Sequence, residues 1–287
     1  MIALELESVS RQFVTPDGGS YRALDNVSLA IPAGAFVAIV GPSGCGKSTL
    51  LNIAAGLVAP SSGSVRVDGD ALSGLNRRAT YMFQQDALLP WKNVRENVAL
   101  GLVLAGVAVA DANAQANEWL ARVGLSAFAA HYPSQLSGGM RKRVTMAQNW
   151  ILDRGMLLMD EPFSALDVHT RQRMETELLT LWESTTESAQ RLPGRSSGNA
   201  ERATAGTPRL KKTVVFVTHD LEEAIALADE VVVLSAGPAS HVVARHPVAL
   251  DRPRDLFELR TSAAFIDLYR LLWAVLRDEV IKSQRDA

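Results

Sequence analysis

The pattern of apolar and polar residues first predicts a set of β-strands. Apolar and charged residues alternate near the N-terminus, and short continuous apolar runs recur further along the chain. Alternation is typical of a half-buried strand, and a continuous run of β-branched and other apolar residues is typical of a strand buried in a parallel sheet. The expected strands cover residues 2–9, 21–31, 36–40, 64–69, 80–84, 156–160, 213–218, 230–234 and 241–248.

Helical periodicity dominates the middle and the end of the chain. From 93 to 150 alanine and leucine prevail, which predicts a mostly helical insertion in an α/β core. Further helices are expected at 47–57 and 168–182, and a helical tail at 251–287. The apolar residues of the tail fall near one face, and they are Phe265, Leu268, Leu271, Leu272, Val275 and Leu276. We expect this face to dock onto its own domain or to contact a second subunit.

One segment differs from the rest in composition. Residues 184–210 contain Ser, Thr, Gly, Pro, Arg and Ala with almost no large apolar side chain. Such a segment cannot bury enough surface to offset the entropy of ordering it, so we expect a flexible surface insertion. It is either tolerated without function or used for regulation or partner binding. The expected organisation is a domain over 1–250 followed by the tail at 251–287.

Composition narrows the possible functions. The chain has 287 residues, is 47% hydrophobic and carries a formal net charge of −2, which gives no support for nucleic-acid binding. Its single cysteine, Cys45, excludes an internal disulfide. The N-terminus lacks a secretory signal, and the longest apolar stretch, 98–110, is shorter than the about 20 residues that span a bilayer. We therefore expect a soluble protein that a partner would hold at any membrane.

A glycine-rich segment between the expected strand at 36–40 and the following helix predicts a phosphate-binding loop. Glycines let the backbone curl so that several N–H groups point inward, and the helix N-terminus adds partial positive charge. Lys47 can reach the β and γ phosphates of a nucleoside triphosphate, and the Ser48 hydroxyl can ligate Mg²⁺. The segment consists of Gly41, Pro42, Ser43, Gly44, Cys45, Gly46, Lys47, Ser48 and Thr49.

Two carboxylates follow the apolar strand expected at 156–160. A buried strand delivers its last side chains to the edge of the sheet, where ligands of open α/β folds bind. We expect Asp160 to hold Mg²⁺ directly or through water, and Glu161 to position or deprotonate the attacking water.

A second candidate for phosphate binding lies at Leu136–Met140. Ser137, Gly138 and Gly139 stand at the expected start of a helix, where their backbone N–H groups can bind an anion. Alone, this pattern fits an ordinary helix cap. Because the P-loop already occupies one side of the phosphates, the pattern suggests a nucleotide shared between two chains.

Together these motifs resemble the ATP-binding-cassette (ABC) ATPases, over about residues 3–250. The resemblance implies a P-loop NTPase fold with a RecA-like α/β core, an antiparallel β subdomain and an inserted helical subdomain. It implies a D-loop at 164–167, a Q-loop glutamine at Gln84 that contacts Mg²⁺ or the water, and a switch histidine at His219 that contacts the γ phosphate. Phe13 falls where the family stacks an aromatic ring on adenine, although Tyr21 competes for that role. The family further implies a homodimer in which Ser137 and Gly139 of one subunit close over the ATP of the other.

Within this family the chain is similar to the importer ATPases for nitrate, sulfonate, taurine and related solutes. The similarity rests on 41–49, 85–91, 93–98, Met140 and 234–236. It implies a peripheral subunit on the cytoplasmic face of the inner membrane, a transmembrane permease and, indirectly, an extracytoplasmic solute-binding protein. Residues 88–91 and the next helix would form part of the permease groove, with Trp91 either an exposed anchor or buried in its own subdomain.

The chain also departs from that branch. The departures are at 146–150, at 237–240 and in the 184–210 insertion, and none includes Lys47, Asp160 or Glu161. ATP hydrolysis coupled to transport is therefore the expected function. The alternative is a soluble ABC ATPase that acts on nucleic acid or ribosomes, which commonly has two cassettes or a long coiled-coil insertion.

Overall fold

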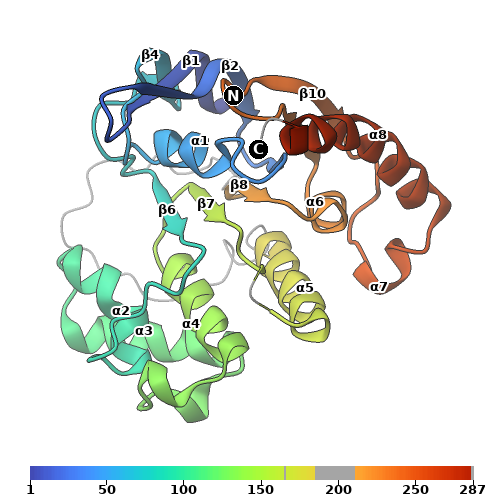
Figure 1. The fold of residues 1–287 in the computed structure, drawn as a ribbon. Coiled ribbons are helices and arrows are strands. Elements are labelled where there is room, and N and C mark those ends of the chain that lie inside the picture. The colour runs from blue at the N-terminus through green and yellow to red at the C-terminus, as the bar shows by residue number, and fades with distance from the viewer. Residues whose placement is uncertain (165, 185–210, 286–287) are drawn as a thin grey trace.

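Two β-sheets form the frame of the protein, which a computed structural model describes over residues 1–164, 166–184 and 211–285 (Figure 1). The antiparallel sheet has the order β2-β1-β4-β5, from β1 (Ile2–Val14), β2 (Ser20–Pro32), β4 (Ser62–Val67) and β5 (Asp70–Ala71). The larger sheet has the order β10-β9-β3-β8-β7-β6 and is parallel except for β10. Its strands are β3 (Phe36–Val40), β6 (Ala79–Met82), β7 (Met156–Asp160), β8 (Thr213–Thr218), β9 (Glu230–Leu234) and β10 (Val242–Pro247).

The larger sheet is buried on both faces, and its side chains alternate between two cores. Phe36, Ala38 and Val40 of β3 join the core formed with the helices on one face, whereas Val37 and Ile39 join the other core. That second core contains α1 (Lys47–Ala54) and the inner face of the antiparallel sheet. Figure 1 shows α1 between the two sheets. Burial on both faces explains why these strands are continuous apolar runs.

The helical part of the chain has a core of its own. It contains α2 (Val94–Leu104), α3 (Val109–Arg122) and α4 (Gly138–Trp150), with short 3₁₀ turns at Ser126–Phe128 and Pro133–Gln135. These helices pack at the end of the molecule opposite the antiparallel sheet (Figure 1). The expected helical texture of 93–150 is therefore present in the structure.

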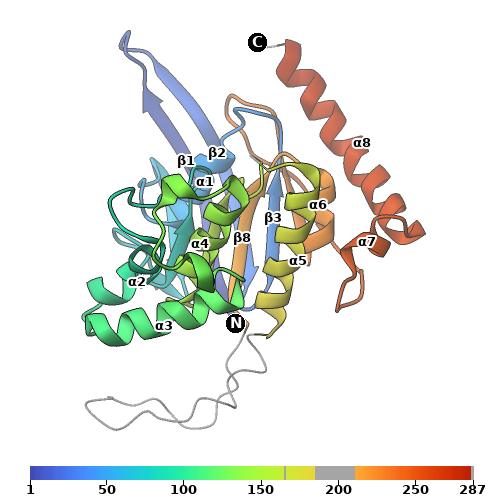
Figure 2. The same ribbon diagram turned by 90° about the horizontal axis from the view of Figure 1, so that it is seen from below.

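The remaining helices cover the face of the large sheet that is opposite α1. They are α5 (Val168–Ser184), α6 (Leu221–Leu227), α7 (Leu256–Leu259) and α8 (Ala263–Arg285). Figure 2 shows the tail helix α8 on the outer side of α6. Phe265, Leu272 and Leu276 of α8 are buried in the core that contains α6, so the tail docks onto its own domain. No helix in the described ranges is long and apolar enough to cross a membrane.

The structure corrects three details of the sequence prediction. Leu271 does not share the buried face of the tail, because its side chain is 48% exposed. Helix α1 ends at Ala54 and not at 57, since Gly56 has a φ of +70° and a Cβ there would lie 1.9 Å from the carbonyl oxygen of Gly74. The first two strands extend to Val14 and back to Ser20, because irregularities in the pairing let the hairpin continue past residue 9. Residues 185–210 of the expected insertion lie outside the described residues.

Candidate nucleotide-binding and catalytic site

The P-loop joins β3 to α1, and its backbone needs glycine at defined positions. Gly44 and Gly46 have φ angles of +77° and +91°, in the left-handed region that side chains rarely adopt. A Cβ at Gly46 would also lie 2.9 Å from Leu24 Cδ2. Ser43, Gly44 and Ser48 are exposed along the rim of the loop, so its outer surface is open to a ligand.

Lys47 supports the loop from within. Its side-chain nitrogen donates hydrogen bonds to the carbonyl oxygens of Gly41 and Pro42, both at 2.9 Å, and the residue is only 5% exposed. An ammonium group has three N–H donors, and the third contact of Lys47 is a long one of 4.0 Å to Cys45 Sγ, a weak acceptor that a phosphate oxygen could replace. Cys45 is fully buried beside it, and burial raises the pKa of its thiol.

A hydroxyl and a carboxylate meet where an Mg²⁺ ion would be expected. Ser48 Oγ donates to Asp160 Oδ1 at 2.9 Å, across the space between α1 and the end of β7. Burial is the main reason that the pKa of Asp160 is raised, and the Ser48 hydrogen bond opposes this effect. Mg²⁺ prefers oxygen ligands such as these, so the residues fit the ion.

Tyr81 is a member of this group that the sequence analysis did not assign to the site. Its hydroxyl donates to Asn52 Oδ1 at 2.9 Å and lies 3.4 Å from Asp160 Oδ2. The pKa of Tyr81 is raised, first by burial and then by the negative charge of Asp160. The proximity of Asn52 to Tyr81 depends on how α1 packs against β6, and no local pattern in the sequence indicates it.

Glu161 is contacted by the two other residues that the sequence analysis predicts to be catalytic. Gln84 Nε2 donates to Glu161 Oε2 at 3.1 Å, and His219 Nδ1 lies 3.3 Å from the same oxygen. The three residues follow β6, β7 and β8, which are neighbours in the sheet. The carboxyl ends of parallel strands meet at one edge, so residues separated by more than a hundred positions in the chain come together there.

The expected signature residues lie at the start of α4, in the helical part of the molecule. Ser137 is the N-cap of α4, and its Oγ accepts a hydrogen bond from the Met140 N–H at 3.3 Å. A Cβ at Gly139 would lie 2.7 Å from Thr170 Cγ2, whereas one at Gly138 would meet nothing closer than 3.8 Å. Among the described residues, no hydrogen bond joins residues 137–139 to the P-loop of the same chain.

The Q-loop is tied to the helix that follows the signature residues. Arg141 Nε is 3.2 Å from Asp86 Oδ2, and buried Lys142 donates to the Gln84 carbonyl oxygen at 3.2 Å. Lys142 also approaches Asp86 Oδ1 at 3.7 Å, and burial lowers its pKa. These contacts connect α4 through Gln84 to Glu161. The sequence analysis named Gln84 but missed Asp86, because a single acidic residue in a loop has no distinctive pattern.

Both candidates for stacking on adenine lie in the β1–β2 hairpin. Phe13 and Tyr21 are directly opposite each other in the strand register. The guanidinium of Arg11 lies 4.5 Å from the centre of the Phe13 ring. The Tyr21 hydroxyl and the Gly44 carbonyl oxygen of the P-loop both lie near Gly237, since a Cβ at Gly237 would be 3.4 Å from each of them. The choice between these two rings stays a prediction.

Comparisons with known proteins identify the family of this chain. The sequence profile described as "ABC transporter" matches residues 24–164. An uncharacterised ABC transporter ATP-binding protein of Methanocaldococcus jannaschii is 38% identical over 282 residues, covering 98% of this chain and 94% of that protein. A taurine import ATP-binding protein of Rhizobium johnstonii is 39% identical over 277 residues, covering 95% of this chain and 96% of the relative.

A solved structure shows the same fold in a nucleotide-bound assembly. It is a dimeric ATP-binding cassette in a post-hydrolysis state, bound to ADP and phosphate. It is 30% identical, with a TM-score of 0.68, and the match covers 86% of this chain and all of that one (100%). With its P-loop, its carboxylate pair and these relatives, the chain belongs to the ABC transporter family, as an ATPase subunit of the importer branch.

Proposed function

We propose that this chain hydrolyses ATP to drive an importer for a small anionic or zwitterionic solute of the taurine, sulfonate or nitrate type. The observation that carries the proposal is the convergence of Gln84 and His219 on one oxygen of Glu161. Lys47 and the Ser48–Asp160 pair belong to the same edge of the sheet, where β3 and β7 end. The choice of solute class is supported by the taurine import relatives.

In this proposal each residue of the site has a separate role. The backbone N–H groups of 41–49 and the Lys47 ammonium hold the phosphates, while Ser48, Asp160 and Gln84 provide oxygen ligands for Mg²⁺. The ion would neutralise charge that develops on the phosphate oxygens. Glu161 accepts a proton from the attacking water, and His219 donates a hydrogen bond to the γ phosphate.

Two copies of the chain would complete each site. Residues 137–139 lie at the start of α4, where the first backbone N–H groups of a helix have no partner within the helix. A second copy facing head to tail would place them on the γ phosphate of the first. The dimeric cassette with bound ADP and phosphate supports this arrangement.

The permease would dock on the helical part of the molecule. Trp91 is 71% exposed, which excludes the alternative that it is buried in its own subdomain. Its loop is held rigidly, because the buried Asn97 side chain accepts from the Leu89 N–H and donates to the carbonyl oxygens of Leu89, Lys92 and Asn93. An exposed aromatic ring on a fixed loop is a suitable anchor for a partner. The subunit would then be peripheral, on the cytoplasmic face of the inner membrane.

A reconstitution experiment tests the proposal. The chain is co-purified with the permease encoded beside it and placed in liposomes, and phosphate release is measured with the cognate solute-binding protein. Stimulation by binding protein loaded with taurine, an alkanesulfonate or nitrate, but not by empty binding protein, is the expected result. Co-purification with ribosomes and no permease would instead support the alternative of a soluble ABC ATPase.

A further inference from the structure

The helix that follows the switch histidine is short and depends on its surroundings. Helix α6 has seven residues, Leu221–Leu227, and begins directly after His219 and its N-cap, Asp220. Asp220 Oδ1 accepts hydrogen bonds from the N–H groups of Glu222 and Glu223. A helix of this length is not stable by itself, so its position is set by the groups that hold its ends.

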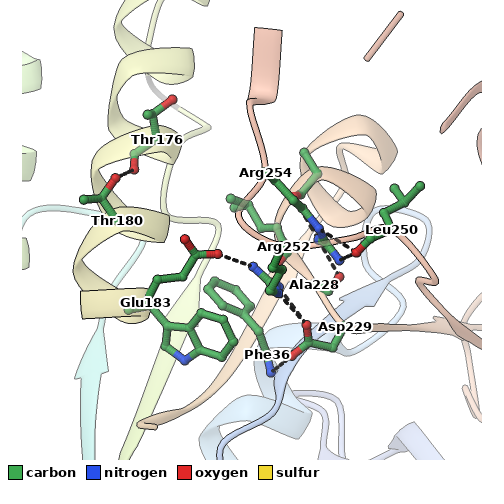
Figure 3. Close-up of polar contacts among 12 residues, drawn as sticks. Phe36, Thr176, Thr180, Glu183, Ala228, Asp229, Leu250, Arg252 and Arg254 are labelled. Carbon is green, nitrogen blue, oxygen red and sulfur yellow. Dashed lines mark hydrogen bonds and ion pairs between the residues drawn. The ribbon is translucent and has the colours of Figure 1, made fainter. Parts of the chain in front are cut away.

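The C-terminal end of α6 is capped by a residue from the tail. Arg254 is 8% exposed, and its NH1 donates to the carbonyl oxygens of Ala228 at 2.8 Å and Ala226 at 3.0 Å (Figure 3). A weaker contact reaches the Ile225 carbonyl at 3.4 Å. The last carbonyls of a helix have no partner within the helix, and a cation there also complements the helix dipole. Burial lowers the pKa of Arg254 to about 10, so the guanidinium remains charged at neutral pH.

A second tail arginine fixes the segment after α6. Arg252 NH2 lies 2.7 Å from both Asp229 Oδ1 and the Leu227 carbonyl oxygen, and its NH1 is 3.3 Å from Glu183 of α5 (Figure 3). The other oxygen of Asp229 accepts from the Phe36 N–H at the start of β3, at 2.9 Å. The tail therefore contacts the last turn of α6 and α5 directly, and it is linked to the central sheet through Asp229.

A third arginine links the tail to the other end of α6. Arg260 NH2 is 2.5 Å from Glu175 Oε2, a carboxylate that is fully buried in α5, and Arg260 Nε is 3.9 Å from Glu222 at the start of α6. Arg171, also in α5, contacts Asp220 Oδ2 at 2.9 Å and the Leu166 carbonyl oxygen at 3.4 Å. Both ends of α6 are thus fixed, and the tail contributes to each.

From these contacts we infer that the C-terminal tail is part of the ATPase machinery and that Arg254 is a positioning residue for hydrolysis. The guanidinium acts through α6, since it caps the C-terminal end of this helix and His219 directly precedes Asp220, the N-cap at the other end. Loss of the guanidinium leaves buried carbonyl oxygens without donors, and α6 relaxes to restore their hydrogen bonds. That movement displaces His219, while the P-loop between β3 and α1 keeps its own contacts.

The test compares Arg254→Ala in two backgrounds, the natural sequence and the His219→Ala variant, and it rests on the role of His219 proposed above. We expect Arg254→Ala to lower kcat roughly tenfold in the natural sequence and to have no further effect in His219→Ala. Affinity for a non-hydrolysable ATP analogue should stay within about twofold of the natural protein, since the P-loop is unchanged. The control is Arg270→Gln, whose side chain is 77% exposed on α8, and it should leave both quantities unchanged.

Other outcomes would overturn the inference. Equal losses of kcat in both backgrounds would show that Arg254 does not act through His219, and parallel losses of kcat and ATP affinity would indicate a general structural role. If His219→Ala alone had the kcat of the natural protein, the proposed role of His219 in hydrolysis would be contradicted. If Arg254→Ala does not fold, Arg254→Lys replaces it in the same comparison. A lysine retains the charge but lacks the forked donors of arginine, so we expect a smaller loss of kcat in the natural sequence. In the His219→Ala background this loss should again be absent.

Discussion

At the scale of single residues, the position of Glu161 depends on an unusual backbone conformation. Its φ is +42°, and its N–H donates to the Val217 carbonyl oxygen at 3.0 Å. Side chains other than glycine seldom adopt this region, and such conformations persist where surrounding contacts hold them. The contact with β8 turns the chain sharply after Asp160, so that two adjacent carboxylates point to different partners, Ser48 and Gln84.

Replacing this carboxylate should separate nucleotide binding from hydrolysis. In Glu161→Gln we expect turnover to fall by roughly 10²–10⁴-fold, the usual effect of losing a general base. ATP affinity should be retained, because the P-loop contacts do not involve this side chain, and dimers should accumulate in the presence of ATP. Phosphate release and size-exclusion chromatography with ATP measure the two effects. A variant with normal turnover would show that another group accepts the proton.

Buried Glu223 should make stability depend on pH. Burial is the main reason that its pKa is raised to about 8; the charges of Glu175 and Asp220 act in the same direction, whereas the hydroxyl of Thr218 and the charge of Arg171 oppose the rise. The folded protein therefore binds more protons than the unfolded chain between the ordinary glutamate pKa of 4.5 and about 8. Stability contributed in this way is complete at low pH and is lost as the pH rises through about 8.

The variant Glu223→Gln removes this titration while keeping an acceptor for the Thr218 hydroxyl. Relative to the natural protein, its melting temperature should rise with pH between 5 and 8.5. Glu222→Gln, whose side chain is 57% exposed, is the control and should follow the natural profile. Parallel profiles for Glu223→Gln and the natural protein would contradict the assignment.

At the scale of elements, the start of α4 packs tightly against the start of α5. The tight contact is between Gly139 and the methyl group of Thr170, where a Cβ would lie 2.7 Å away. Real Cβ atoms do not approach so closely, so the Thr170 side chain or one of the helices must shift if a side chain is added. The neighbouring Gly138 has room for a methyl group. Two adjacent glycines in one helix therefore have different requirements.

This difference predicts opposite effects for two similar substitutions. Alanine normally stabilises a helix by about 1 kcal/mol relative to glycine, so Gly138→Ala should be neutral or stabilising in thermal unfolding. Gly139→Ala should lower the melting temperature, because the clash exceeds that gain. Thr170→Ser removes the methyl group and should restore most of the loss in the double variant. A destabilised Gly138→Ala with a stable Gly139→Ala would show that the helices meet differently.

The strands buried on both faces could be predicted from the sequence, and the ends of exposed elements could not. Strands β3, β7, β8 and β9 have the expected bounds, because a continuous apolar run is interrupted where the strand leaves the core. The β1–β2 hairpin continues into solvent, where side chains have no apolar pattern to mark its length. Leu271 was placed on the wrong side of α8 because the angular spacing of neighbouring leucines cannot distinguish residues at the margin of a buried face.

At the scale of the whole molecule, the sequence indicated the main site residues but not the contacts that support them. The motif residues were recognisable because glycines, carboxylates and a lysine occur beside strand ends. Tyr81, Arg171 and Arg254 contact their partners only through the packing of distant elements, and an isolated tyrosine or arginine carries no such signal. The largest gap concerned the tail, whose length and periodicity predicted a helix but not its attachment to α6.

Docking of the whole subunit on a permease should depend on Trp91. We expect Trp91→Ala to lower the amount of chain that co-purifies with the permease roughly tenfold or more. The reason is that truncating a central aromatic anchor commonly weakens binding by at least this factor. Leu75→Ala is the control, since Leu75 is 63% exposed between β5 and β6 and lies outside the helical part of the molecule. Equal capture of both variants by a tagged permease would contradict the proposed docking surface.

The contacts of Glu161 also affect how fast an isolated subunit would hydrolyse ATP. Gln84 Nε2 and His219 Nδ1 lie 3.1 Å and 3.3 Å from Oε2 of this carboxylate, so a water molecule would have to compete with both side chains for that oxygen. For that oxygen to accept a proton from water, at least one of the two side chains would have to move away from it. A subunit without its partners would therefore hydrolyse ATP slowly, and rapid hydrolysis would require an assembly that draws Gln84 and His219 toward the nucleotide.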